Sequence, residues 1–563
     1  MADNFGRRKF LKGSLLGLGL SSLNFDTILQ AISKGIISDL MANEPGANNL
    51  NYVGIQMHGG PPRWLWDLPL HVQNGGASNN LSYNPCVITK FDENGSGVYE
   101  STEVGGILLP SMWSSSVNTI GGSMTISDLA DDSLFIRGVV YPNGAHEGKW
   151  HSVIPFFGAP GIHTFPQGQP GYNRPVDCVQ MSKNIAACYP YKPRVNGSSV
   201  NLAFTEDPNP VSKLLSPFKF GQNTIQSPAD SSLPRGFGNE NQMRRKINEA
   251  IDRLERVAKS INQKSEKLFI DHRRAKEQFS IAIDAFVSEY STRNDSYKQL
   301  IATNMTSNTI DGVEGVHSAR GGELAPLYRY NKSDSVPEGT SLDSLFLNAN
   351  MNTLAGSMAL IEILLKNRLT SSIVMGIGNM EGFHIPGVSN SPNKFRSDCH
   401  FTGAALALVG FSKYYKCLSG CLLSLRNKLT TEGLWDKTVL HIQGDFNRSP
   451  RVDGTGSDHG AAGSNTTIMS GLINGPKVIG GTYINTPEDL YYDWGVAATY
   501  NAADFSDEPF TNHHIEASFA KVFNATSSVR VPPLFDIIDG QIQPTIDVQH
   551  SARNIPYPNE EEG

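Results

Sequence analysis

Residues 437–445 read Lys-Thr-Val-Leu-His-Ile-Gln-Gly-Asp, a short apolar run that ends at a glycine and a carboxylate. The length of this run and its β-branched residues predict a buried strand over 437–443. A second run, Ser372-Ile-Val-Met-Gly-Ile-Gly378, has the same character. Between the two, a long apolar stretch over 401–429 predicts a helix. A strand, a helix and a strand in succession are typical of parallel sheets.

The same alternation extends over most of the chain. Further strands are expected at 51–58, 134–140, 466–472 and 478–483, and further helices at 342–369 and 515–523. We therefore expect an α/β fold with a mostly parallel central sheet and helices on both faces.

Two stretches depart from this pattern. Residues 155–235 are dense in Pro, Gly, Asn and Ser and are expected to be irregular. Over 240–300, apolar residues recur every three or four positions with charges between them, which predicts a helical insertion. A single domain over 50–545 would hold these elements, followed by a disordered tail over 550–563.

The composition excludes several classes of protein. The chain has 563 residues, of which 39% are hydrophobic, so it is not a mostly disordered chain. Its 47 basic and 54 acidic residues give a net charge of −7, which argues against binding to nucleic acid through phosphates. No run approaches the ~20 apolar residues of a membrane-spanning helix, so no transmembrane anchor is expected.

The N-terminus resembles an export signal. Arg7 and Arg8 precede Phe10 and Leu11, and a short apolar, glycine-broken stretch follows. This pattern matches the twin-arginine signal, so residues 1–42 are interpreted as signal and leader. The alternative is an amphipathic surface helix. A twin-arginine signal implies the export machinery as a partner and a periplasmic or extracellular location.

Polar side chains follow the predicted strands where each one ends. Glu381 and His384 come after the strand 372–378, Asp445 comes after 437–443, and the next loop carries Asp458 and His459. The carboxyl ends of parallel strands meet at one sheet edge, so these groups are expected to converge. Carboxylate and imidazole together suit a divalent ion such as Zn²⁺, Mn²⁺, Mg²⁺ or Ca²⁺. The alternative is structural, with the Asp residues in turns and the His packed on its loop.

The order of these elements resembles the alkaline phosphatase and sulfatase superfamily. Within it, several stretches are similar to an uncharacterised bacterial family exported by the twin-arginine route. These stretches are the signal at 7–12, Gly59-Gly60-Pro61, Leu434-Trp435-Asp436, Gly444-Asp445-Phe446-Asn447-Arg448-Ser449-Pro450 and Ser457-Asp458-His459-Gly460. The resemblance implies an alkaline phosphatase-like fold with two metals. Glu381, His384 and His459 would serve one of them.

The same resemblance implies Asp445 as a ligand of the other metal and Asp67 as a bridging carboxylate. Asp458, beside His459, is a further candidate metal ligand. The chain also departs from the family pattern. Where the family carries Asp-Thr-His, this chain has Glu381-Gly-Phe-His384, and where the family often has Ser after Gly-Gly-Pro it has Pro62.

The chain also departs from the superfamily pattern in the segment that is expected to hold the nucleophile. The segment expected to hold a Ser, Thr or Cys nucleophile is 144–152, where the reactive groups are His146, His151 and Ser152. A histidine there could be a nucleophile or a general acid, a third metal ligand, or a structural residue. Arg448 could bind a phosphate or sulfate oxygen, or form a salt bridge to Asp445 or Asp453.

Two functions therefore stay open. The first is an exported metal-dependent hydrolase of phosphate or sulfate esters, acting on a small molecule or a glycan. The second is a non-catalytic scaffold of the same fold that binds glycan or envelope components. Trp64, Trp66, Trp113 and Trp150 could form an aromatic platform for sugar rings or could simply fill the core.

Overall fold

Strand β1 (Asn51–Met57) runs through the middle of the central sheet and is buried along its whole length. In the computed structural model, the described residues are 49–69, 89–91, 97–139, 162–170, 172, 174, 178–181, 199–201, 288–306, 318–388, 391–445, 447–451, 453–460, 464–480, 482–484, 494–500, 510–526, 529–545 and 548–553. The chain divides into two units, residues 1–40 with 207–290 and residues 41–206 with 291–563. Almost all of the first unit lies outside the described residues, so the second is described below.

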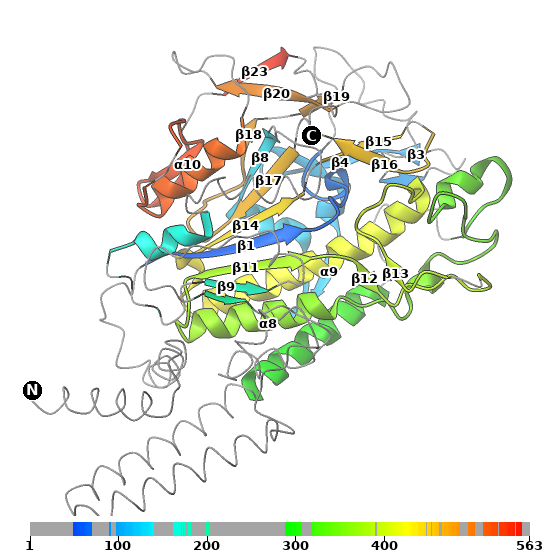
Figure 1. Cartoon of the computed structure of the whole chain (residues 1–563), viewed down its shortest axis with the longest axis horizontal. Coiled ribbons are helices and arrows are strands. Elements are labelled where there is room, and N and C mark those ends of the chain that lie inside the picture. The colour runs from blue at the N-terminus through cyan, green and yellow to red at the C-terminus, as the bar shows by residue number, and fades with distance from the viewer. Residues whose placement is uncertain are drawn as a thin grey trace, which may run out of the picture. The chain divides into compact units, whose positions relative to one another are not determined.

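Eight strands of the described residues form the central sheet, in the order β10-β9-β11-β1-β14-β17-β8-β18 (Figure 1). All run in one direction except β17, which is antiparallel to both of its neighbours. The mainly parallel sheet predicted from the sequence is therefore confirmed. Besides β1, the bounds are β8 Ser133–Val139, β9 Cys178–Met181, β10 Ser199–Asn201, β11 Ser372–Ile377, β14 Thr438–Gly444, β17 Ser464–Met469 and β18 Lys477–Gly480.

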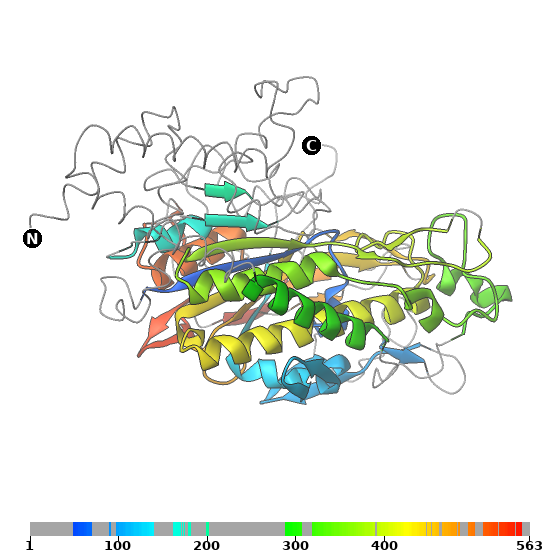
Figure 2. The ribbon, with the colours of Figure 1, turned by 90° about the horizontal axis from the view of Figure 1, so that it is seen from below.

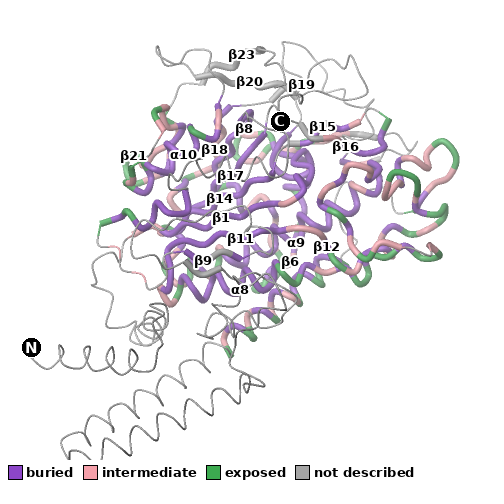
Figure 3. Tube along the Cα trace, viewed as in Figure 1, coloured by how far each residue is buried: buried purple, intermediate pink, exposed green. Residues whose placement is uncertain are grey.

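Helices cover both faces of this sheet. Successive side chains of a strand point to opposite faces. On one face Tyr52 and His441 pack against Phe519 of α10 (Asn512–Val522), with ring centroids 5.6 and 4.8 Å from the Phe519 ring. On the other face lie α8 (Asn352–Lys366) and α9 (Ala404–Thr431), which run side by side (Figure 2). Between these two layers, β1, β8, β11, β14 and β17 are buried along their whole length (Figure 3).

Short strand pairs lie outside the main sheet. They are β2 Lys90–Phe91 with β3 Gly97–Val98, β4 Ser101–Val104 with β5 Ile107–Pro110, β6 Ser116–Thr119 with β7 Gly122–Thr125, β12 Met380–Glu381 with β13 Lys394–Phe395, β15 Asn447–Pro450 with β16 Ser457–Gly460, and β21 Phe535–Ile538 with β22 Gln541–Pro544. A three-stranded sheet contains β19 Thr482–Ile484, β20 Trp494–Tyr500 and β23 Val548–Arg553.

Three local predictions were wrong. Residues 155–235 are not wholly irregular, because β9 and β10 extend the sheet beyond β11. The helix expected from 342 starts only at Asn352. The backbone groups of Asn350 form hydrogen bonds with those of Glu381 and are therefore not available for helical hydrogen bonds. The strand expected over 478–483 is two strands, β18 and β19, in different sheets.

The predicted insertion over 240–300 is described only at its end, where residues 288–306 are helical. Arg293 in this helix makes two hydrogen bonds of 2.6 and 2.8 Å to the buried Glu362 carboxylate of α8. The Tyr297 hydroxyl donates a third to the same carboxylate, at 2.5 Å. Among the described residues, no helix is both long enough and apolar enough to cross a membrane. The export signal and the tail lie outside those residues.

Candidate active site at the carboxyl ends of β11, β1 and β14

The carboxyl ends of three adjacent strands are level with one another. Met57 of β1 is in register with Ile377 of β11 on one side and Gly444 of β14 on the other. The chain segments that follow, with Asn379 and Asp445, therefore leave the sheet at the same edge. The strands β11 and β14, which precede the predicted site residues, are not direct neighbours, because β1 lies between them.

The loop after β1 turns sharply at Gly59 and Gly60, which have φ values of +83° and +57°. The Gly59 amide donates a 2.8 Å hydrogen bond to the Asp445 carboxylate, which is 2% exposed. The Gly60 carbonyl accepts a 2.6 Å hydrogen bond from Arg448 Nε, and the Gly59 carbonyl also accepts from Arg448. Because left-handed backbone favours glycine, this loop needs both glycines.

A second segment, residues 397–401, is held between two glycines. A Cβ on Gly59 would lie 2.5 Å from the Asp398 amide nitrogen, and a Cβ on Gly456 would collide with the His400 carbonyl. Gly456 precedes β16, which pairs with β15 so that Ser449 is opposite Asp458. The close fit on both sides fixes where this segment presents its side chains.

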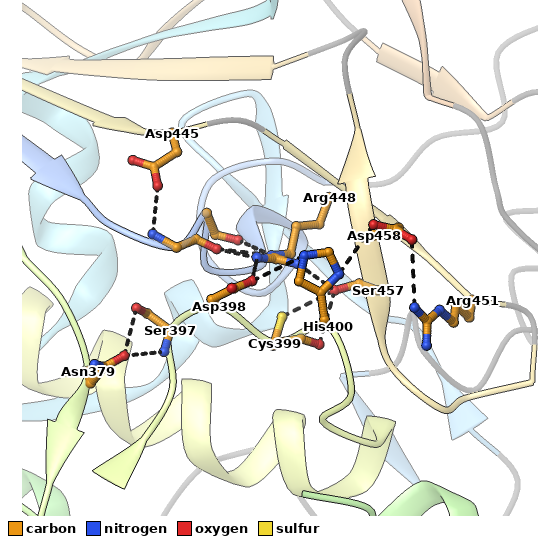
Figure 4. A network of polar contacts seen from close by, with 12 residues as sticks. Asn379, Ser397, Asp398, Cys399, His400, Asp445, Arg448, Arg451, Ser457 and Asp458 are labelled. Atoms are coloured by element: carbon orange, nitrogen blue, oxygen red, sulfur yellow. Dashed lines mark hydrogen bonds and ion pairs between the residues drawn. The ribbon is translucent and has the colours of Figure 1, made fainter. Parts of the chain in front are cut away.

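Two side chains of this segment, Asp398 and His400, belong to a chain in which basic and acidic groups alternate. We call this chain the edge network: Arg448, Asp398, His400, Asp458 and Arg451 (Figure 4). The Arg448 guanidinium pairs with Asp398. His400 Nε2 lies 3.5 Å from Asp398 Oδ1, and His400 Nδ1 lies 3.2 Å from Asp458 Oδ1. Arg451 Nη2 completes the chain 3.6 Å from Asp458 Oδ2.

Burial changes along the edge network. The Arg448 side chain is 0% exposed, whereas both carboxylates are 41% exposed and the His400 side chain is 25% exposed. The network therefore has a fixed, buried base and an imidazole with two carboxylates that solvent can reach. This arrangement is suited to proton transfer on a molecule bound from the solvent side.

Beneath the network the packing is tight. The buried Cys399 thiol lies 3.2 Å from the Ser457 hydroxyl, and burial raises the pKa of this thiol. The void that Cys399, Ser457, Pro62 and Trp64 help to line has a volume of about 10 Å³, which is room for about one water.

The predicted metal ligands do not all lie together. Asp67 is buried in an ion pair with Arg63 and accepts hydrogen bonds from Asn465 and Thr467 at 2.7 and 2.6 Å. Glu381 lies in β12, opposite Lys394 of β13, and is exposed, as is His384.

Other predicted residues are seen only in part. The backbone of His459 lies in β16 opposite Arg448, but its side chain is outside what is described. His146 and His151 lie outside the described residues. Within the part of the chain that the structure describes, no three His, Cys, Asp or Glu side chains are arranged to hold a metal ion.

Asp398 and His400 were missed in the sequence. Glu381 and His384 are the first carboxylate and histidine after the strand 372–378, and they were therefore predicted as the site residues. A usable signal was present, because Asp398-Cys399-His400 places the two side chains two residues apart just before the helix that starts at Ala404. For Arg448, the ion pair that the structure shows is with Asp398, a partner that was not predicted.

Of the four tryptophans considered for a sugar platform, three lie in the described residues, and they belong to the core. Trp66 and Trp113 are 0% exposed and Trp64 is 4% exposed. The Trp66 ring stacks on Tyr415 of α9 at a centroid distance of 5.6 Å. These residues therefore fill the space beside α9 and offer no surface for a sugar ring.

Fold and site together define an α/β protein with a mainly parallel sheet and a charged network at the carboxyl ends of its central strands. No protein-family model, no curated protein and no solved structure matches the chain.

Proposed function

We propose that this protein is an exported hydrolase of phosphate or sulfate esters, with its active site at the edge network. The observation that carries the proposal is His400 held between the carboxylates of Asp398 and Asp458 at 3.5 and 3.2 Å. Imidazole is the side chain that most often serves as a general acid or base in enzymes, and the two carboxylates orient this one.

The order of elements along the chain supports the alkaline phosphatase-like part of this proposal. In the superfamily order, a strand is followed by a carboxylate and a His, a helix, a second strand, an Asp, a loop and a His. The uncharacterised family that this chain resembles carries Asp-Thr-His at the first of these positions. Asp398-Cys399-His400 fits the first of these motifs more closely than Glu381-Gly-Phe-His384 does. With this change, two groups of the pattern adjoin one another, since His400 Nδ1 lies 3.2 Å from Asp458 Oδ1.

A divalent ion belongs to the proposal as an expectation from the same resemblance. Carboxylate and imidazole donors suit Zn²⁺ or Mn²⁺. However, the side chains of Asp398, His400 and Asp458 form ion-pair contacts with one another and with arginines, so we assign no reaction step to an ion. Arg7 and Arg8 carry the proposed export, and replacing both by Lys should abolish it.

The experiment measures turnover of chromogenic aryl phosphates and sulfates, with elemental analysis of protein purified without chelator. Asp398→Asn, His400→Asn and Asp458→Asn should each lower kcat by about 100-fold or more, as expected for loss of acid–base catalysis. Asp539→Asn, an exposed carboxylate in the turn between β21 and β22, is the matched control. Loss of activity in Glu381→Gln but not in Asp398→Asn would move the site to the residues first predicted.

One observation favours the alternative of a non-catalytic scaffold that binds glycan or envelope components. Three predicted site groups bind the protein's own atoms: Asp67 pairs with Arg63, Asp445 accepts from Gly59, and Arg448 donates to Gly60. On this alternative, the purified protein turns over no aryl ester, and chelation leaves its stability unchanged.

A further inference from the structure

Next to His400 of the edge network, the ring of Phe401 makes cation–π contacts with Arg451 and Lys332. The Arg451 guanidinium carbon lies 5.0 Å from the ring centroid and the Lys332 ammonium lies 5.9 Å from it. The His400 and Phe401 rings are 6.0 Å apart. Lys332 is exposed and Phe401 is half-buried, so the ammonium and the ring lie at the surface beside the proposed site, whereas Arg451, a member of the edge network, is 11% exposed.

Backbone hydrogen bonds place all three residues. The Gly403 amide donates to the Arg329 carbonyl at 2.8 Å, which brings the turn with Lys332 alongside Phe401. Within that turn, Asn331 Oδ1 accepts from the amides of Ser333 and Asp334 at 2.9 and 2.8 Å. The Arg451 amide donates to the Gly456 carbonyl at 3.0 Å, so Arg451 is fixed to the loop that holds the 397–401 segment.

The contact of Lys332 with the ring has a different consequence from a salt bridge. A carboxylate partner would neutralise the ammonium, whereas an aromatic ring holds it in place and leaves its charge available. Within the described residues no carboxylate pairs with Lys332. The nearest candidate in sequence, Asp334, accepts a 2.8 Å hydrogen bond from Asn331 instead. An unneutralised cation held beside a reactive network is a feature of anion recognition.

We propose that Lys332 and Arg451, seated on Phe401, form a subsite for a second anionic group of the substrate. This inference rests on the proposed ester hydrolysis. The substrate class that it selects is an ester that bears a further carboxylate, sulfate or phosphate beside the one that reacts. Lys332 supplies most of the attraction, because Arg451 also faces Asp458 at 3.6 Å.

The test compares para-nitrophenyl phosphate with an analogue that carries one carboxylate on the same ring, and the corresponding pair of sulfates. In Lys332→Met, KM for the carboxylated ester should rise about five-fold with kcat unchanged, the scale of an exposed ion pair. KM for the ester without the carboxylate should change less than two-fold. Lys332→Arg should restore the preference, and high salt should weaken it in the unchanged protein.

Two results would overturn the subsite: equal changes of KM for both esters in Lys332→Met, or no change for either. Lys521→Met is the matched control, since Lys521 is an exposed lysine of α10, on the other side of the sheet. If the unchanged protein hydrolyses neither ester, the proposed function fails, and the subsite is tested by calorimetric binding of the same compounds. Tighter binding of the carboxylated compound that Lys332→Met abolishes supports the subsite, and equal binding of both compounds refutes it.

Discussion

The guanidinium of Arg448 is completely buried, while Asp398, the carboxylate that it pairs with, is 41% exposed. The buried Arg448 thus holds the exposed Asp398 carboxylate in position. Arg448 can do so because its Nε and Nη2 also donate to the carbonyls of Gly59 and Gly60, so the glycine loop, the arginine and the aspartate form one unit.

Removing this arginine should destabilise the protein. Arg448→Met leaves the Gly59 and Gly60 carbonyls without their donor, and hydrogen bonds to charged groups contribute about 1.5–3 kcal/mol each. Because Asp398 can be solvated in the variant, we expect a loss of about 3 kcal/mol in the free energy of unfolding. The loss should be smaller in Arg448→Lys, which keeps the positive charge and one donor nitrogen. Urea denaturation measures it. Equal stability of Arg448→Met and the unchanged protein would contradict the supporting role.

Gly59 should tolerate no side chain. Gly59→Ala combines an unfavourable backbone at φ +83° with a Cβ 2.5 Å from the Asp398 amide. We expect a cost of about 3 kcal/mol, the sum of left-handed strain and overpacking.

Gly540 provides the matched control for this substitution. It has φ +77°, but a Cβ there would meet nothing within 4 Å. Gly540→Ala should therefore cost only about 1 kcal/mol, the strain alone. If thermal unfolding shows the same loss of stability in Gly59→Ala and Gly540→Ala, the 397–401 segment is not packed closely against Gly59.

The sequence predicted the sheet well because its central strands are long. β1, β11 and β14 are runs of six or seven buried residues. Such apolar runs predict a strand from the local sequence alone, without knowledge of which strands lie beside them. β9 and β10, with four and three residues, are too short to differ from loop in composition.

The site was less predictable, for a geometric reason. Asp445 follows its strand directly, so its position at the sheet edge could be inferred from the chain order. Asp398 reaches the same edge only after the β12–β13 hairpin, and it stays there because two glycines and Arg448 hold it. Contacts of this kind join residues far apart in sequence, so no local pattern encodes them.

The helix 288–306 should depend on one carboxylate. Glu362 accepts from Arg293 at 2.6 and 2.8 Å and from Tyr297 at 2.5 Å while it is 3% exposed. Glu362→Gln removes the charge and one acceptor, so we expect about 2 kcal/mol less stability.

Glu432→Gln is the control for this change. Glu432 pairs with Lys428 four residues earlier on α9, but both side chains are more than a quarter exposed. Its loss should cost less than about 0.5 kcal/mol. Hydrogen exchange should report faster opening of residues 291–306 in Glu362→Gln alone, and equal exchange in the two variants would exclude this anchoring role.

Buried histidines should make the protein sensitive to mild acid. Burial lowers the pKa of His441 to about 3 and that of His163 to about 4. In the unfolded chain both would titrate near the ordinary value of about 6.5. As the pH falls below that value, the unfolded state takes up protons that the folded state does not, so stability should decline until the pH approaches 3 to 4.

His441 should carry a measurable share of this decline, up to about 1.4 kcal/mol per pH unit between pH 6 and 4. His441→Asn should therefore flatten the dependence of unfolding free energy on pH, whatever its own stability at pH 7.5. Tyr52→Phe is the control, because it removes only the hydroxyl 2.9 Å from His441 Nδ1 and leaves the imidazole buried. It should lower stability by about 1 kcal/mol at every pH without changing the slope. Urea denaturation at a series of pH values separates the two, and an unaltered slope in His441→Asn would show that this imidazole does not titrate on unfolding.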